Sequence, residues 1–218
     1  MIWPTKPNGA IFLDKIRLDK TTRLDYLDSI EALPLRTTVA EIIKKHNCKT
    51  VVDVGCGVGR MYDFIDVEKY MGFDDDWRLI NPGKRARPAA DLRIASWKDL
   101  DRLDVEFDVD CLLFLGVLSY AMPEYPEVFD KNGLHYNMFH DMVNLYRPKI
   151  IIIQEILAEQ TLVSASNELQ TLPLDYYMNF NPVSHELDLP IWCGHRVILE
   201  IDSKNVYEAY KTTNVARD

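Results

Sequence analysis

The chain has no long apolar run, and this excludes a membrane-spanning protein. The longest runs, Cys111–Leu115 and residues 150–153, have the length of buried strands, whereas a membrane-spanning helix needs about 20 apolar residues. Residues 1–6 also lack the charged and then apolar layout of a secretory signal. We therefore expect a cytoplasmic protein without a membrane partner.

Cysteine is scarce, and its spacing excludes two kinds of stabilising site. The four cysteines are scattered and form no Cys-x-x-Cys pair, so we expect reduced, mostly buried thiols rather than a disulfide framework. The sequence Cys193-Gly194-His195 is too short and isolated to bind a metal ion. We predict no required metal.

Positive charge is also in short supply. The chain carries 25 Lys and Arg against 34 Asp and Glu, for a formal net charge of −9. Proteins that bind nucleic acid through its phosphates usually present a basic face, so a nucleic-acid partner is disfavoured. It is still possible, because five basic residues cluster between two predicted strands. They are Arg78, Lys84, Arg85, Arg87 and Arg93.

The most informative segment joins a short β-branched run to a glycine-rich loop. Val51, Val52 and Val54 suit a strand that is buried on both faces, as in a parallel sheet. Asp53 lies in this strand, and the loop then reads Gly55-x-Gly57-x-Gly59. Glycine permits positive φ and a close approach of a ligand to the backbone. Strand, loop and a following helix together predict a nucleotide-type site.

The spacing departs from the dinucleotide fingerprint Gly-x-Gly-x-x-Gly, because Arg60 stands where that pattern has its last glycine. It resembles motif I of the class I methyltransferases, which use S-adenosylmethionine (SAM). In that family the loop wraps the methionine end of the cofactor and the acid helps to hold it. The resemblance therefore assigns five residues to SAM: Asp53, Gly55, Cys56, Gly57 and Gly59.

Three later segments extend the resemblance. Asp74 follows the second predicted strand, where the family has an acid that binds the ribose hydroxyls, with Asp75 as the adjacent alternative. Ser96 and Trp97 follow the third strand, where the family contacts adenine. The family often has an acid at this turn, which is missing here. Phe114 and Leu115 end the fourth strand, where they would pass under the cofactor and frame its methyl group.

The pattern of elements predicts an α/β fold. Strands are expected at 50–54, 70–73, 92–95, 110–115 and 149–156, and helices at 19–33, 38–45, 58–65, 127–146 and 157–169. Residues 195–201 and 205–211 read as a final antiparallel hairpin. We predict a three-layer α/β/α sandwich with a mostly parallel seven-stranded sheet and this hairpin at the C-terminus, the class I methyltransferase fold.

The chain reads as one domain, because it has no repeat, linker or break in composition. Within 1–218, residues 1–36 are expected to be an N-terminal lid or substrate segment and 37–218 the Rossmann-like core. Residues 170–194, an aromatic-rich stretch of that core, are predicted to be an acceptor lid.

Candidates for catalysis are fewer. Tyr120 follows the fourth strand, Glu155 ends the fifth, and His185 lies in the predicted lid. A hydroxyl or ammonium acceptor must lose a proton, and each of these side chains could orient the acceptor or accept that proton. A histidine or acid at such positions is often only a packing or surface residue, so the general base stays open.

The leading hypothesis is a SAM-dependent methyltransferase that methylates oxygen or nitrogen on a small molecule or biosynthetic intermediate. Two alternatives stay open. One is an RNA or other nucleic-acid methyltransferase that uses the basic 78–93 segment against phosphates. The other is a non-catalytic, SAM-binding regulatory subunit. Fold alone does not decide among them.

Overall fold

The structure is a computed structural model. It describes residues 33–118, 134–156, 162–163, 169–170, 177–187 and 196–215. Of the predicted N-terminal lid, only residues 33–36 are described, and they begin a helix. The expected helix over 19–33 therefore lies outside the described residues except for its last position.

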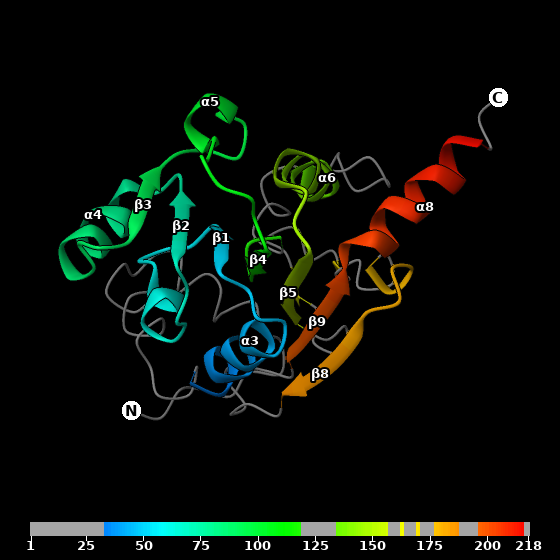
Figure 1. The fold of residues 1–218 in the computed structure, drawn as a ribbon, viewed down its shortest axis with the longest axis horizontal. Coiled ribbons are helices and arrows are strands. Elements are labelled where there is room, and N and C mark those ends of the chain that lie inside the picture. The colour runs from blue at the N-terminus through cyan, green and yellow to red at the C-terminus, as the bar shows by residue number, and fades with distance from the viewer. Residues whose placement is uncertain are drawn as a thin grey trace.

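Seven strands of the described chain form one sheet in the order β3-β2-β1-β4-β5-β9-β8 (Figure 1). The first five pair in parallel, and β9 is antiparallel to both of its neighbours, β5 and β8. The strands are β1 (Thr50–Val54), β2 (Lys69–Asp74), β3 (Asp91–Ile94), β4 (Cys111–Leu115), β5 (Ile150–Ile156), β8 (Val183–Leu187) and β9 (Arg196–Asp202). Two further short strands, β6 (Leu162–Val163) and β7 (Leu169–Gln170), pair with each other.

Helices cover both faces of the sheet, and two apolar clusters fill the space beneath them. The described helices are α3 (Leu33–Lys45), the 3₁₀ turn η2 (Arg60–Asp63), α4 (Trp77–Ala86), α5 (Leu100–Leu103), α6 (Leu134–Tyr146) and α8 (Ser203–Val215). Helices α3 and α4 pack on one face through residues such as Ile42 and Ile80. Helices α5, α6 and α8 pack on the other through Leu103, Phe139 and Val206. The predicted three-layer sandwich is confirmed.

The register brings the carboxyl ends of the parallel strands to one edge of the sheet. Val54 of β1 lies opposite Phe73 of β2 and Phe114 of β4. The glycine loop, Asp74 and the turns after β3 and β4 therefore leave the sheet side by side. In open α/β sheets, ligands bind outside this edge.

Several element predictions are wrong. Residues 205–211 belong to helix α8, not to a strand, because Val206, Tyr207 and Tyr210 recur at helical spacing and pack against the cluster under α6. The antiparallel hairpin is formed instead by β8 and β9. Residues 183–187 of the predicted lid are thus part of the sheet.

Other elements differ in kind or length. The predicted helix at 157–169 is contradicted at 162–163 and 169, which are strand. The predicted helix at 58–65 is reduced to the single turn η2. Helix α3 begins at Leu33, earlier than the predicted start at residue 38, and α4 was not predicted. Within the described ranges, no helix is both long and apolar enough to cross a bilayer.

A buried carboxylate ties helix α3 to the antiparallel end of the sheet. Glu200 of β9 is 6% exposed and accepts a hydrogen bond from Lys45 at 2.8 Å. His46 lies 2.7 Å from the same oxygen, and His185 of β8 lies 3.0 Å from the other. Burial alone would raise the pKa of Glu200, but the hydrogen bonds from Lys45, His46 and His185 outweigh it and lower the pKa to about 2.

Glu200→Gln should destabilise the fold at pH 7 by about 1–3 kcal/mol, since the replacement removes the carboxylate that binds the Lys45 ammonium and both imidazoles. A carboxyl whose pKa is depressed in the folded state stabilises above its unfolded pKa, and that contribution is lost as pH falls through the folded pKa. The gap between wild type and variant should therefore close between pH 4.5 and about 2. Urea unfolding across this range measures it. Glu68→Gln, in an exposed pair with Lys49, should change little, and an equal effect of both substitutions would contradict the assignment.

Candidate functional site

The glycine loop after β1 has a backbone that requires glycine. Gly55, Gly57 and Gly59 have φ of 66°, 58° and 70°, a left-handed conformation that other residues rarely adopt. The loop is also closely packed. A Cβ on Gly55 would lie 2.4 Å from Val117 Cγ2, and one on Gly59 would lie 2.7 Å from Leu92 Cδ2. Cys56 donates its N–H to the carbonyl of Phe73 at 3.0 Å, which fixes the loop to β2.

Asp74, at the end of β2, connects the loop to the start of α4. Its Oδ2 accepts the N–H of Gly57 at 3.0 Å, and its Oδ1 accepts the N–H of Asp76 at 2.9 Å. The residue is 9% exposed. A carboxylate has about four acceptor positions and can accept hydroxyl groups as well as backbone N–H groups. Asp75, the alternative acid, is exposed.

Asp53 is buried in the middle of the site. It is 2% exposed, and its Oδ2 accepts a hydrogen bond from Tyr70 Oη at 2.7 Å. Burial raises the pKa of Asp53 to about 7; the Tyr70 bond opposes the rise and the nearby charge of Asp74 adds to it. Among the described residues, Oδ1 of Asp53 has no hydrogen-bond partner. A buried oxygen without a donor is rare in proteins, and an unfilled ligand position is one accepted cause.

Arg87, which follows α4, binds the backbone of the glycine loop. Sequence reasoning did not identify this contact. The Arg87 guanidinium donates to both oxygens of Asp63, at 2.8 Å and 2.5 Å, and to the carbonyl of Val58 at 3.0 Å. Arg87 is 6% exposed. In the sequence it belongs to a basic cluster that reads as solvated surface, and no local signal separates it from the exposed members.

The turn after β3 places Ser96 and Trp97 next to Asp74. The N–H of Ala95 donates to the carbonyl of Asp74 at 3.1 Å. Ser96 donates its N–H to Asp99 Oδ2 at 3.1 Å. Trp97 is half-buried and packs against the cluster under α6, with the Lys98 ammonium 5.3 Å from its ring centroid. The structure therefore brings both residues to the edge where Asp53 and Asp74 lie.

Phe114 and Leu115, the two residues predicted to contact the cofactor at the end of β4, lie on opposite faces of the sheet. Phe114 is fully buried and packs against Phe139 of α6, with ring centroids 5.6 Å apart, so its side chain belongs to the core. Leu115 is half-buried on the opposite face. Gly116 follows with φ of 75° and donates its N–H to the carbonyl of Gln154 at 3.1 Å. At this edge, Leu115 is the side chain left for a ligand contact.

Two of the three catalytic candidates, Glu155 and His185, lie on described strands, and these strands are β5 and β8. Tyr120 lies outside the described residues. The backbone of Glu155 lies near the carboxyl end of β5, at the same edge as the glycine loop. His185 lies on β8 at the far side of the sheet, where its ring contacts Glu200. In the described part of the chain, no group of three or more His, Cys, Asp or Glu could hold a metal ion.

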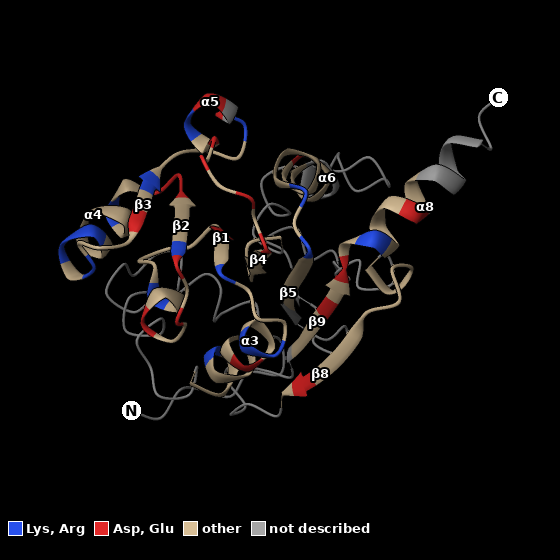
Figure 2. Ribbon diagram, in the orientation of Figure 1, with Lys and Arg blue, Asp and Glu red and all other residues tan. Residues whose placement is uncertain are grey.

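The basic cluster is largely neutralised within the protein. Arg78 donates to both oxygens of Asp76, at 2.6 Å and 2.7 Å, and Arg87 and Arg93 pair with Asp63 and Asp91. Lys84 and Arg85 are exposed on α4. Figure 2 shows Lys and Arg in blue on α4 and on β3, with Asp and Glu in red nearby.

Neither a protein-family model nor a curated protein matches the sequence. Solved structures match in fold. The N-methyltransferase NodS from Bradyrhizobium japonicum, in complex with S-adenosyl-L-homocysteine (SAH), superposes with a TM-score of 0.64 at 10% identity over 89% of this chain and 98% of that one. The chain has the class I methyltransferase fold.

Two further solved structures show the same class I methyltransferase fold. Magnesium protoporphyrin IX methyltransferase (ChlM) from Synechocystis, with bound SAM, gives a TM-score of 0.58 at 13% identity over 92% of this chain and 99% of that one. The methyltransferase domain of bacterial CtHen1-C gives 0.55 at 16% identity over 77% and 95%. At such low identity the likeness concerns the fold.

Gly55→Ala should destabilise the protein by about 1–3 kcal/mol, because alanine would be strained at positive φ and its Cβ would collide with Val117. The double variant Gly55→Ala/Val117→Ala should recover the part of the loss that comes from the collision. Gly116→Ala is the matched control for the backbone part, since its φ is 75° and the nearest atom would lie 3.3 Å away. Urea unfolding measures all three. A double variant no more stable than Gly55→Ala would contradict the collision.

Proposed function

We propose that this chain is a SAM-dependent methyltransferase that methylates an oxygen or nitrogen of a small molecule or biosynthetic intermediate. The observation that carries the proposal is the buried, unpartnered Oδ1 of Asp53, placed between a glycine loop and a second acid at the carboxyl edge of a sheet with the class I methyltransferase fold. The known structures of this fold include complexes with SAM and SAH.

The residues present fit SAM in kind. Asp53 offers a buried anionic acceptor for the ammonium group of the methionine end, where a Cβ on the loop would collide with its neighbours. Asp74 supplies a carboxylate at the end of β2, the kind of group that accepts the ribose hydroxyls, with the exposed Asp75 as the alternative. Ser96 and Trp97 supply a polar group and an aromatic face for the adenine. SAM has no phosphate, so the loop's role would be shape and backbone hydrogen bonding.

SAM supplies a methyl group that its sulfonium already activates. The protein must therefore hold the acceptor in line, exclude water and, for a hydroxyl or ammonium acceptor, accommodate a proton. Leu115 offers an apolar contact at the strand edge. Glu155 is the candidate base whose position on β5 best supports that role, and Tyr120 stays a prediction. His185 is held by Glu200 on the face covered by α3, which favours a pairing role.

The small-molecule acceptor is favoured over nucleic acid by the ion pairs of the basic segment. Three of its five cations are bound to carboxylates of this same chain, so their charge is compensated before any phosphate approaches. The net charge of −9 also disfavours the approach of a nucleic acid.

Calorimetry should show SAH binding by the wild type, and Asp53→Asn should weaken it by about tenfold or more, because an amide carries no charge for the ammonium group. Since the pKa of Asp53 is about 7, wild-type affinity should rise from pH 6 to pH 8, and the variant should lose this rise. The absence of SAH binding, or unchanged affinity in Asp53→Asn, would contradict the proposal.

The same substitution should stabilise the free protein at pH 8. An acid whose pKa is raised on folding makes folding less favourable as pH rises from its unfolded value through about 7. The upper limit is roughly 4 kcal/mol, at about 1.4 kcal/mol for each tenfold change in proton affinity. Urea unfolding at pH 5 and pH 8 tests whether Asp53→Asn raises the free energy of unfolding at the higher pH. Tyr70→Phe should instead lower the free energy of unfolding at pH 8, because it removes the hydrogen-bond donor to Asp53.

Lys84→Glu/Arg85→Glu should leave methyl transfer from labelled SAM to a low-molecular-weight extract unchanged. These side chains are exposed on α4, whereas Arg87 braces the glycine loop and is unsuitable for charge reversal. Transfer to RNA that falls with salt and is lost in this variant would favour the nucleic-acid alternative instead. SAH binding without transfer to any fraction would favour the regulatory subunit.

A further inference from the structure

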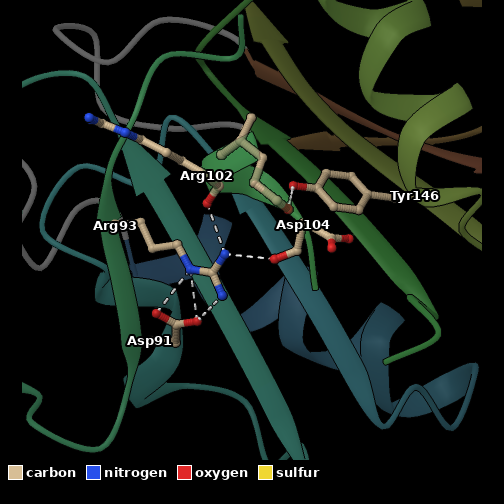
Figure 3. Close-up of polar contacts among 6 residues, drawn as sticks. Asp91, Arg93, Arg102, Asp104 and Tyr146 are labelled. Atoms are coloured by element: carbon tan, nitrogen blue, oxygen red, sulfur yellow. Dashed lines mark hydrogen bonds and ion pairs between the residues drawn. The ribbon is translucent and has the colours of Figure 1, made fainter. Parts of the chain in front are cut away.

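The C-terminal end of helix α5 is held by two side chains from other elements (Figure 3). Nη1 of Arg93 donates to the carbonyls of Arg102 and Asp104, at 2.9 Å and 2.7 Å. The hydroxyl of Tyr146, from the end of α6, donates to the carbonyl of Leu103 at 2.7 Å. The last carbonyls of a helix have no donor within the helix, so these side chains supply donors to three successive carbonyls.

Asp91 fixes the direction of the Arg93 guanidinium. The two residues are two positions apart on β3, so their side chains lie on the same face of the strand. Nε and Nη2 of Arg93 donate to Asp91 Oδ2 at 3.0 Å and 2.6 Å. The planar guanidinium then points its remaining nitrogen at α5, which a flexible ammonium would not do with the same precision. β3 is one of the two edge strands of the seven-stranded sheet.

A chain of hydrogen bonds connects this contact to the Ser96–Trp97 turn. The N–H of Arg102 donates to the carbonyl of Asp99 at 2.8 Å, and the N–H of Asp99 donates to the carbonyl of Ser96 at 2.9 Å. Asp99 in turn accepts the N–H of Ser96. The other end of the turn is fixed to Asp74 through Ala95. A shift of α5 would therefore move Ser96 and Trp97 relative to the ribose acid.

We propose that Arg93, oriented by Asp91, is a positioning residue that fixes the Ser96–Trp97 turn and so determines selectivity for the base of the cofactor. The inference rests on the proposed function, since it assigns the adenine end of the SAM site to this turn. Arg93 acts through the backbone of α5, not by touching the ligand. Substitution of Arg93 should weaken recognition of the base and leave the contacts with the methionine end unchanged.

The test compares the dissociation constants of SAH and of its analogue in which hypoxanthine replaces adenine, by calorimetry on the whole chain. The wild type should prefer SAH by about tenfold or more, as a site that hydrogen-bonds a ligand group rejects an analogue lacking it. Arg93→Gln should weaken SAH binding by about tenfold and reduce the preference to about threefold or less. Asp53→Asn should weaken both ligands and keep the preference.

Arg102→Gln is the matched control, because it makes the same change in net charge on α5 itself and keeps the carbonyl that Arg93 binds; the Arg102 side chain is exposed. It should bind as the wild type does. If circular dichroism shows that Arg93→Gln does not fold, Asp91→Asn and Tyr146→Phe take its place, and the preference should fall in both.

Two results overturn the inference while leaving the proposed function intact. One is a wild type that binds SAH without preferring adenine. The other is an Arg93→Gln variant, or its two substitutes, with reduced thermal stability but the wild-type preference. A wild type that binds neither ligand would instead refute the proposed function itself.

Discussion

The candidate site depends on the hydrogen bonds that converge on Asp74. Its carboxylate accepts the N–H of Gly57 from the glycine loop and the N–H of Asp76 at the start of α4. Its carbonyl accepts the N–H of Ala95 from the turn after β3. Three segments that are separate in the sequence thus take their positions from one residue. The same carboxylate also raises the pKa of Asp53, so it shapes the electrostatics of the site as well as its geometry.

The features that local chemistry dictates could be predicted from the sequence. Glycines at positions 55, 57 and 59 indicate a loop with positive φ, and all three have positive φ in the structure. The apolar runs of β1, β4 and β5 predict strands that are buried on both faces. The acid that ends β2 could be identified because a carboxylate at a strand end is a short-range signal. Its hydrogen bond to Gly57 could not, since that bond depends on how two strands lie side by side.

The predictions failed where tertiary packing overrides local signals. Helix α4 was not predicted, because Pro82 and Gly83 within it are residues that usually interrupt a helix. Gly83 is required there because a Cβ would lie 2.6 Å from the carbonyl of Val58. β8 carries the polar sequence of an exposed edge strand and gives no apolar alternation to detect. Phe114 was assigned to the cofactor from its place in a motif; strand alternation directs its ring into the core, and its contact with the cofactor stays a prediction.

The arginines of the 78–93 segment show why a basic cluster in a sequence is a weak sign of a phosphate-binding surface. A guanidinium has five donors in a fixed plane, and Arg87 and Arg93 use theirs on a carboxylate and on backbone carbonyls of nearby loops. These directional hydrogen bonds fix the positions of the loops, which non-directional apolar contacts at an exposed edge would not do. Because each arginine is paired with an aspartate, neither adds net positive charge to the surface. Arg87 and Arg93 therefore hold the loops of the candidate site in place and argue against electrostatic capture of a polyanion.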